Sequence, residues 1–388
     1  MAETLRLSVL YVAWAYPKLS ETFVQKEIEL MRRRGHDVRV VAVRRPAAGH
    51  PIDKEAVYLD PRARQVLAAI PRVLRPTTRF ANRLPEDLVC RLIAQIAVRQ
   101  LNGWSPHVVH AHFMDRPATV ALHMSNLLGI PTTVTAHARD WTVHSSAESL
   151  RAKGRAADHI FAISEQAVRD LARKASISSD KMSVCRASFS ASEPGSQSEI
   201  VNNTIVAVAR LVPKKGLDVL VDAMPTVIAA RKDARLIVVG EGPERARLDA
   251  RVRSLGLSSS VAFLGAQPNS KVFAILASGT VFALPCRVMT DGDADGIPVV
   301  LMEAGAFGLP IISTPTGGVA ELVQQGVTGL LVPQNDPAAL ASSILRLLDD
   351  EGLRAELAAN MKRHLRREFD PELQASRLES VWSSLARA

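Results

Sequence analysis

Residues 280–303 read TVFALPCRVMTDGDADGIPVVLME, and this stretch predicts the fold of the chain. Its largely apolar start, Thr280 to Leu284, predicts a buried strand. An acidic, glycine-rich turn follows, and Pro298 suits the first position of a helix because its missing N–H costs nothing there. A strand, a loop and a helix in this order put the loop at the carboxyl edge of a sheet, where open α/β folds bind ligands.

The loop and the helix after it carry candidate binding residues. Gly296 lets the backbone approach a ligand closely, and the free N–H groups at the start of the helix attract a sugar hydroxyl or a phosphate. Asp295 precedes the helix and Glu303 lies about two turns later. One carboxylate is therefore expected at the mouth of a site and the other along its wall.

The same loop also matches the opening of an EF-hand calcium loop, with alternating acids from Asp291 to Asp295 followed by Gly296. Position twelve of such a loop would be Met302, however, and the acid comes one residue late. A strand also precedes the loop where an EF-hand has a helix. This mismatch argues against calcium, and a solvated acidic turn with a helix cap is the other alternative.

The length of 388 residues and the repeated alternation of strands and helices predict two domains. Both are expected to be Rossmann-like, doubly wound α/β domains, because strand, helix and strand recur within short segments. A small, polar stretch at residues 186–198 suits a linker. We expect an N-terminal domain at residues 1–190 and a C-terminal domain at 191–370, with a final helix at 371–388 packing back on the first.

Composition excludes several classes of protein. An aromatic content of 4% argues against a base-stacking nucleic-acid surface, and no stretch approaches the ~20 apolar residues that span a bilayer. Three scattered cysteines, Cys90, Cys185 and Cys286, fit a reducing compartment. The apolar run near the N-terminus lacks the features of a secretory signal. We therefore expect a cytoplasmic location.

The net charge of +9 is unevenly distributed. Residues 1–195 hold 28 Lys and Arg against 18 Asp and Glu, whereas residues 196–388 hold 20 against 21. Six arginines and no acid lie between Arg62 and Arg83, with apolar residues interleaved at roughly helical spacing. This segment predicts contact with an anionic acceptor or with the inner face of the plasma membrane. A solvated helix with a basic face is the alternative.

Two further motifs follow predicted strands. Arg210 and Lys215 lie between a strand and a helix, where two cations beside a helix start can bind a diphosphate. A basic surface turn is the alternative. Gly240 and Gly242 resemble a dinucleotide fingerprint, but Arg245 stands where its third glycine belongs, so a tight turn is expected.

Histidines follow strands in the first half. His137 ends a predicted strand and is expected to hydrogen-bond a sugar hydroxyl or stabilise charge, although such a histidine is more often structural. His107, His110 and His112 alternate along another strand, and we expect that they do not share one face. No metal site is therefore predicted.

In order and spacing, these motifs resemble the retaining glycosyltransferases of family 4, which have the GT-B fold of two Rossmann-like domains facing across a cleft. The run from Asp291 to Glu303 is especially similar to the subgroup that builds colanic acid and other exopolysaccharides. The matching segments are Ser20–Val24, Val109–Phe113, Thr135–His137 with Asp140, Arg210–Gly216, Val239–Pro243, Asp295–Glu303, and Pro315–Gly318 with Glu321.

The resemblance implies a nucleotide-diphosphate sugar donor, UDP-hexose or GDP-mannose, in the second domain and an acceptor in the first. It implies no metal and no cofactor. It implies catalytic roles for His137, Arg210, Lys215 and Asp295. Donor-binding roles are implied for Gly240, Gly242, Gly265, Gly296, Ile297, Glu303, Thr316 and Gly317. Acceptor-side roles are implied for Ser20, Glu21, Thr22, His112 and Asp140.

The expected function is transfer of a hexose, with retention of configuration, to a glycan, lipid-linked or polysaccharide acceptor. Three alternatives stay open at this point. The acceptor could be a small diffusible metabolite, the chain could be a non-catalytic sugar-nucleotide-binding partner subunit, or it could isomerise the nucleotide sugar. The sequence does not name the oligomeric state.

Overall fold

The computed structural model describes residues 6–18, 21–46, 52–53, 55–59, 85–189 and 202–387. Ser20, the basic segment 62–83 and most of the predicted linker lie outside these residues. Internal contacts divide the chain into two compact units. Unit 1 comprises residues 1–163, 167–186 and 371–388, and unit 2 comprises residues 164–166 and 187–370.

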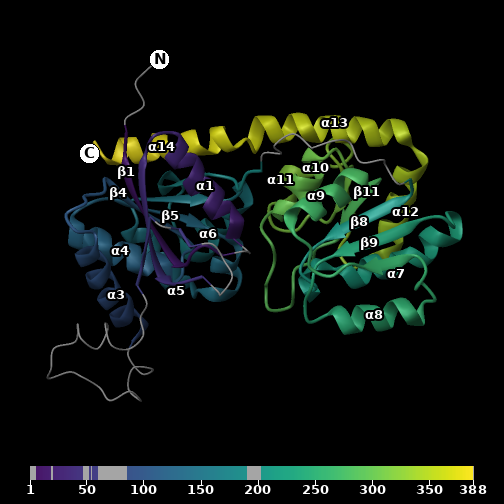
Figure 1. Ribbon diagram of the computed structural model, residues 1–388, viewed down its shortest axis with the longest axis horizontal. Coiled ribbons are helices and arrows are strands. Elements are labelled where there is room, and N and C mark those ends of the chain that lie inside the picture. The colour runs from purple at the N-terminus through teal and green to yellow at the C-terminus, as the bar shows by residue number, and fades with distance from the viewer. Residues whose placement is uncertain are drawn as a thin grey trace. The chain divides into compact units, whose positions relative to one another are not determined.

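Unit 1 is built on a parallel sheet of seven strands in the order β3-β2-β1-β4-β5-β6-β7 (Figure 1). The strands are β1 (Ser8–Ala15), β2 (Asp37–Arg44), β3 (Ala56–Tyr58), β4 (Val108–His112), β5 (Thr132–Ala136), β6 (His159–Ala162) and β7 (Met182–Val184). The helices are α1 (Thr22–Arg33), α3 (Glu86–Gln100), α4 (Arg116–Leu128), α5 (Ala147–Ala156), α6 (Glu165–Ala175) and α14 (Pro371–Leu385), with a π-helical turn at Asp140–His144 and a 3-10 turn at Ser179–Lys181.

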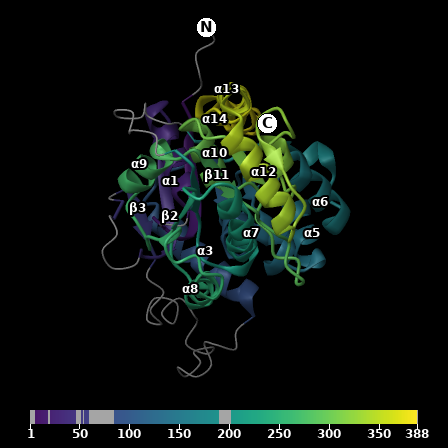
Figure 2. The same ribbon diagram turned by 90° about the vertical axis from the view of Figure 1, so that its right-hand side faces the viewer.

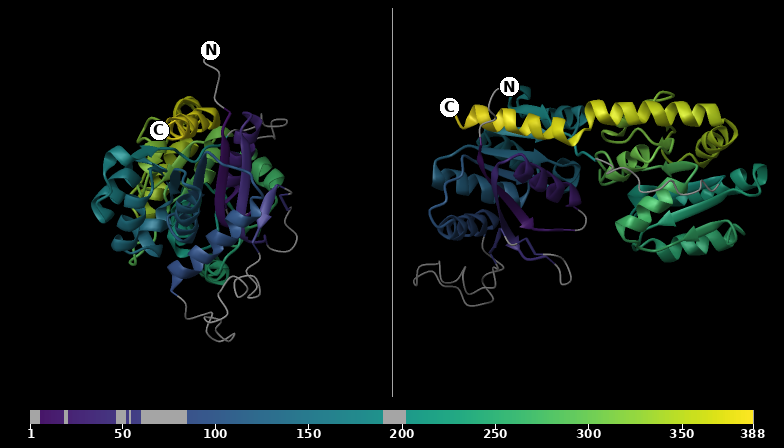
Figure 3. Two further views of the ribbon diagram at one scale, coloured as in Figure 1. Left: turned by 90° about the vertical axis from the view of Figure 1, so that its left-hand side faces the viewer. Right: turned by 45° about the horizontal axis from the view of Figure 1, so that its top comes forward.

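Helices cover both faces of the sheet of unit 1, and most residues of its strands are buried. On one face, Ile28 of α1 and Trp382 of α14 pack in a single apolar cluster with Tyr11 of β1. On the other face, Ile93 of α3 and Val120 of α4 pack against further residues of the same strands. Figure 3 shows α14 lying along the sheet beside α1.

Unit 2 repeats this architecture with a parallel sheet of six strands in the order β10-β9-β8-β11-β12-β13. The strands are β8 (Thr204–Val208), β9 (Arg235–Val239), β10 (Val261–Phe263), β11 (Val281–Leu284), β12 (Ile311–Ser313) and β13 (Leu330–Leu331). The helices are α7 (Leu217–Ala230), α8 (Arg245–Ser254), α9 (Asn269–Ser278), α10 (Val299–Ala306), α11 (Val319–Leu322), α12 (Pro337–Asp349) and α13 (Glu351–Glu368), with a 3-10 turn at Pro213–Lys215. Figure 2 shows α7 and α12 side by side.

The strand order of each sheet reverses at one position. This topology confirms the predicted doubly wound fold. In unit 1 the strand order reverses between β1 and β4, and in unit 2 it reverses between β8 and β11. Loops at the carboxyl ends of the two strands on either side of such a switch point diverge and leave a crevice for a ligand. The loops after β8 and β11 are the two that carry Lys215 and Asp295.

One sequence prediction needs correction in its detail. Pro298 does not occupy the first helical position: its ψ of 122° is extended, so it caps the helix, and α10 begins at Val299. The residue still terminates the acidic loop, because its ring fixes φ near −60°. Within the described residues, no helix is long and apolar enough to cross a membrane.

Helix α14 is attached to the sheet of unit 1 by one large side chain. Trp382 is fully buried, packs edge-on against Tyr11, and donates a hydrogen bond from Nε1 to Thr133 Oγ1 of β5 at 2.9 Å. At the same helix, Glu379 binds Arg34 Nε at 2.6 Å and His36 Nε2 at 2.7 Å. The C-terminal helix is therefore part of the core of unit 1.

Replacing Trp382 with alanine should lower the free energy of unfolding by about 3–5 kcal/mol, because the change leaves a large cavity that the sheet cannot close. Trp382→Phe keeps an aromatic ring and should cost less. Urea unfolding followed by circular dichroism measures both. A loss below about 1 kcal/mol for the alanine variant would contradict the packing described.

Candidate functional site

The charged residues of the site in unit 2 meet at the switch point. Lys215 ends the 3-10 turn after β8, and its Nζ lies 2.7 Å from Asp295 Oδ2 in the loop after β11. Lys214 Nζ lies 3.0 Å from Asp293 Oδ1 and 3.3 Å from Asp295 Oδ1. Two lysines and two aspartates thus join the two loops on either side of the switch point.

Within this largely buried ion pair, Lys215 and Asp295 each shift the pKa of the other. Burial alone would lower the pKa of Lys215, but the Asp295 carboxylate raises that pKa above its usual value. Burial alone would raise the pKa of Asp295, but Lys215 and Lys214 together hold it below its usual value. Lys215 and Asp295 are therefore charged at neutral pH, and each is the main reason why the other remains so.

Arg210 supplies a cation that is not neutralised in this way. It follows β8, is exposed, and lies close enough to Lys215 to oppose the charge on that lysine. Among the residues that the structure describes, no acidic side chain forms an ion pair with Arg210. Its guanidinium is therefore available for an anion beside the buried lysines.

Two glycines allow the loops of unit 2 to touch. Gly216 has φ +65°, and a Cβ added there would lie 1.9 Å from the carbonyl oxygen of Pro285, after β11. Gly317 has φ +52°, and its Cβ would lie 2.3 Å from the carbonyl oxygen of Asp295. Any other residue would push the loop after β11 away from its neighbours on both sides.

The remaining donor-side candidates lie on the same edge of the sheet. The loops after β9 and β10 are joined where the Gly240 N–H donates to the Gly265 carbonyl oxygen at 2.9 Å. Gly242 packs closely against the backbone of Leu211. The Gly318 N–H donates to the Gly296 carbonyl oxygen at 3.1 Å, which ties the turn after β12 to the acidic loop.

Three further candidates lie just before α10, on α10, or in the turn after β12. Ile297 and Glu303 are partly buried, and Glu303 lies on α10 itself. The hydroxyl of Thr316 is buried and finds no hydrogen-bond partner among the described residues. An unpaired buried hydroxyl is costly unless a ligand or water completes it, so Thr316 is a suitable contact for a bound molecule.

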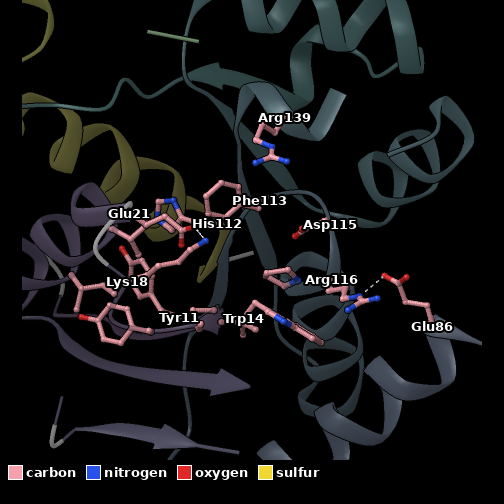
Figure 4. A pocket seen from close by; sticks show the side chains of 17 residues that line it. Tyr11, Trp14, Lys18, Glu21, Glu86, His112, Phe113, Asp115, Arg116 and Arg139 are labelled. Carbon is pink, nitrogen blue, oxygen red and sulfur yellow. Dashed lines mark hydrogen bonds and ion pairs between the residues drawn. The ribbon is translucent and has the colours of Figure 1, made fainter. Parts of the chain in front are cut away.

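In unit 1, a cavity of about 410 Å³ opens at the carboxyl ends of β1 and β4, again at the switch point. Figure 4 shows Lys18 turned toward Glu21, and Arg116 turned toward Glu86, around this cavity. Its lining includes Tyr11, Trp14, Lys18, Glu21, His112 and Arg116. The sequence-predicted residues Glu21 and His112 thus share one cavity, and Thr22 begins α1 next to Glu21.

The histidines of unit 1 correct one prediction. His110 and His112 do lie on the same face of β4, because residues two apart point to the same side of a strand, and their rings meet edge to face at 5.1 Å. His112 Nδ1 lies 3.1 Å from His137 Nε2, at the end of β5. Glu27 of α1 closes the group, with its Oε1 3.1 Å from His112 Nε2.

The segment around His137 is held in an unusual shape. Phe113 has φ +74°, a strained value for a bulky residue, and its ring centre lies 4.3 Å from that of His137. The His137 N–H donates to Asp140 Oδ2 at 2.7 Å. Burial raises the pKa of the Asp140 carboxyl to about 7, and its second oxygen, Oδ1, is buried with no partner in the described part of the chain.

Sequence reasoning missed three residues that the site depends on. Lys214 binds both aspartates of the acidic loop, and only its place beside Lys215 signalled it. Arg287 donates from Nε to the carbonyl oxygen of Pro213 at 2.8 Å, and its Nη2 donates to both carboxylate oxygens of Asp218. These contacts fix the 3-10 turn that carries Lys215. Glu27 is one of several acids on its helix, and nothing in the neighbouring sequence indicates its contact with His112.

Two family models match successive parts of the chain. Residues 20–186 match a model described as Glycosyltransferase Family 4, and residues 195–364 match one described as Glycosyl transferases group 1. The first model ends at residue 186, where unit 1 gives way to unit 2.

Curated relatives cover part of the chain. A GDP-mannose-dependent monoacylated alpha-(1-6)-phosphatidylinositol monomannoside mannosyltransferase from Corynebacterium glutamicum is 38% identical over 186 residues, 47% of this chain and 48% of its own length. A putative colanic acid biosynthesis glycosyltransferase, WcaL, from Salmonella typhimurium is 41% identical over 140 residues, 36% of this chain and 34% of its own length. The matches span about half the length of these relatives or less.

Solved structures match the whole chain in fold. HepE from Anabaena, in complex with UDP, gives a TM-score of 0.75 at 19% identity, covering 98% of this chain and 100% of that one. Sucrose-phosphate synthase from Thermosynechococcus elongatus gives 0.73 at 18% identity, covering 98% and 99%. With both units matched by family models and the GT-B-like fold matched end to end, the chain belongs to the group 1, family 4 glycosyltransferases.

Proposed function

We propose that this chain transfers a hexose from a nucleotide-diphosphate sugar to a glycan or lipid-linked acceptor, with retention of configuration. The observation that supports this most is the meeting of Lys215, Asp295 and unpaired Arg210 at the switch point of unit 2. In this proposal the diphosphate lies beside Arg210 and Lys215. GDP-mannose and a UDP-hexose are the donor candidates, since relatives are named for the first and HepE was solved with UDP.

The charge balance of the site supports a diphosphate ligand. Lys214, Lys215, Asp293 and Asp295 balance in net charge, so among the described residues Arg210 and the positive end of α10 add a net attraction for an anion, while Lys215 supplies a fixed cation beside the diphosphate. As the glycosidic bond breaks, negative charge grows on the leaving diphosphate. A fixed cation beside it stabilises that charge more than it stabilises the bound substrate, and this difference lowers the barrier.

We assign the remaining roles by position. Asp295 holds Lys215 toward the diphosphate and, with the backbone around Gly296 and Ile297, orients the sugar. Glu303 accepts hydrogen bonds from the ribose hydroxyls, and the free hydroxyl of Thr316 completes the phosphate contacts. The cavity of unit 1 receives the acceptor, and His137 hydrogen-bonds a sugar hydroxyl.

Lys215→Ala should reduce kcat by about 10²–10³, the usual cost of removing one group that stabilises developing negative charge. Release of UDP or GDP in the presence of acceptor measures this. Lys232→Ala is the matched control, because Lys232 is an exposed lysine of the same unit. Equal rates for Lys215→Ala and wild type would refute the assigned role.

Donor binding should be visible without any acceptor. A nucleotide sugar at 100 times its dissociation constant should stabilise the protein by about 2.7 kcal/mol, and a thermal-shift panel of GDP-mannose, UDP-glucose and ADP-glucose measures this. Arg210→Ala should weaken the shift for the preferred donor, because the unpaired cation is lost. No shift with any nucleotide sugar would oppose the proposal.

We also propose that the basic segment 62–83, which lies outside the described residues, brings the enzyme to an anionic acceptor surface. Each Lys or Arg near an anionic leaflet contributes about 1 kcal/mol at most, so six arginines suffice for reversible binding. Co-sedimentation with vesicles containing 30% phosphatidylglycerol, about the anionic content that attracts basic segments, should be lost in high salt and when the six arginines become glutamine. Binding that persists after those changes would contradict this assignment.

A further inference from the structure

The partly buried carboxylate of Glu27 lies beside the histidines of unit 1, and the proposed chemistry above does not use it. Glu27 Oε1 accepts a hydrogen bond from the Tyr11 hydroxyl at 2.8 Å and lies 3.1 Å from His112 Nε2. Burial alone would raise the pKa of Glu27, but His112, His110 and Tyr11 together lower it. Glu27 is therefore ionised, and an ionised carboxylate can only accept hydrogen bonds.

This carboxylate determines where the proton of His112 lies. Because Glu27 only accepts, His112 Nε2 must carry a proton and donate it. In neutral His112 the other nitrogen, Nδ1, then has a lone pair and accepts. His137 Nε2 lies 3.1 Å from that Nδ1, so a neutral His112 requires His137 Nε2 to be the donor between them.

The same logic fixes the free nitrogen of His137. Burial lowers the pKa of His137 well below its usual value, and His112 and His110 lower it further, so the ring is neutral. With the proton on Nε2, Nδ1 has only a lone pair, and it finds no partner among the described residues. Phe113 and Phe23 pack against the ring at 4.3 and 5.0 Å between centres and restrict its rotation.

We propose that Glu27 is a positioning residue for His137: acting through His112, it holds His137 as the Nε2–H tautomer, so that Nδ1 meets the ligand as a hydrogen-bond acceptor. The proposal rests on the proposed function in one respect, that His137 hydrogen-bonds a sugar hydroxyl. A lone pair at this point accepts a hydrogen bond from a hydroxyl and repels a phosphate or carboxylate oxygen. The site therefore favours a neutral, hydroxylated sugar over a uronic acid at this contact.

A metal ion is the other occupant that this chemistry admits. Donor atoms of Glu27, His110 and His112 lie within 4.8 Å of one another. Each of these side chains already has hydrogen-bond partners, however: Glu27 and His112 bind each other, and His110 Nδ1 lies 2.8 Å from Thr133 Oγ1. The group is satisfied without a cation, and one equivalent of zinc or another metal in the purified protein would overturn the proposal.

The tautomer can be observed directly. Long-range ¹H–¹⁵N spectra of the full chain, labelled with ¹⁵N-histidine, distinguish protonated from unprotonated ring nitrogens. At pH 8, above the ordinary pKa of histidine near 6.5, we expect His137 as the Nε2–H form, assigned by its absence in His137→Gln. The Nδ1–H form in wild type would overturn the proposal whether or not the enzyme transfers a hexose.

Variants separate positioning from folding. Glu27→Leu removes the acceptor and should let His137 populate both tautomers, with a fall in kcat/KM of about 10- to 100-fold, as for other groups that orient a functional histidine. Glu27→Gln keeps a carbonyl acceptor for His112 and should recover most of the tautomer bias and rate. Glu379→Leu is the matched control, because it removes the carboxylate of the other buried Glu–His pair, at the opposite end of the strands.

The outcomes are distinct. Loss of activity in both leucine variants together would mean that Glu27 acts only through stability, and the proposal would fail. A single tautomer in Glu27→Leu would also overturn it. An inactive wild type with the expected tautomer would refute the proposed function and leave the histidine geometry intact.

Discussion

The ion pair between Lys215 and Asp295 connects the two loops on either side of the switch point in unit 2. Neither charge would be stable alone at its depth, because removing one partner leaves a buried charge without compensation. The pair therefore ties the loop after β8 to the loop after β11 and, through the close approach at Gly317, to the turn after β12. The donor-side candidates keep a common geometry because this contact holds their loops together.

The two units use one topology for different chemistry. In each, the strand order reverses once, and the candidate site forms at that reversal. Unit 2 places at the reversal charges that balance one another and adds Arg210, which has no ion-pair partner among the described residues. Unit 1 lines its cavity with aromatic rings, charged side chains and His112, which Glu27 contacts. The first environment offers fixed ion pairs beside a cation, and the second offers an open cavity with aromatic walls.

The sequence predicted the parts of this arrangement that depend on local order along the chain. The strand at Val281–Leu284, the acidic loop and the helix that carries Glu303 could be predicted because periodicity, glycine and proline are local signals. Contacts between distant segments could not. Glu27 meets His112 across 85 residues of chain, and Lys214 meets Asp293 across 79, so no local pattern reports either contact. His107, His110 and His112 are predicted not to share one face, although the spacing of two between His110 and His112 already places these two together.

The hydrogen bond from Trp382 to Thr133 links helix α14 to the histidines of unit 1. Thr133 Oγ1 also lies 2.8 Å from His110 Nδ1, and His110 meets His112 edge to face. An unbroken series of contacts therefore leads from the last helix to the imidazoles at the sheet edge. A fusion partner or a surface that competes for α14 would loosen this helix. Such a change alters the polar interior of unit 1 without any contact with substrate.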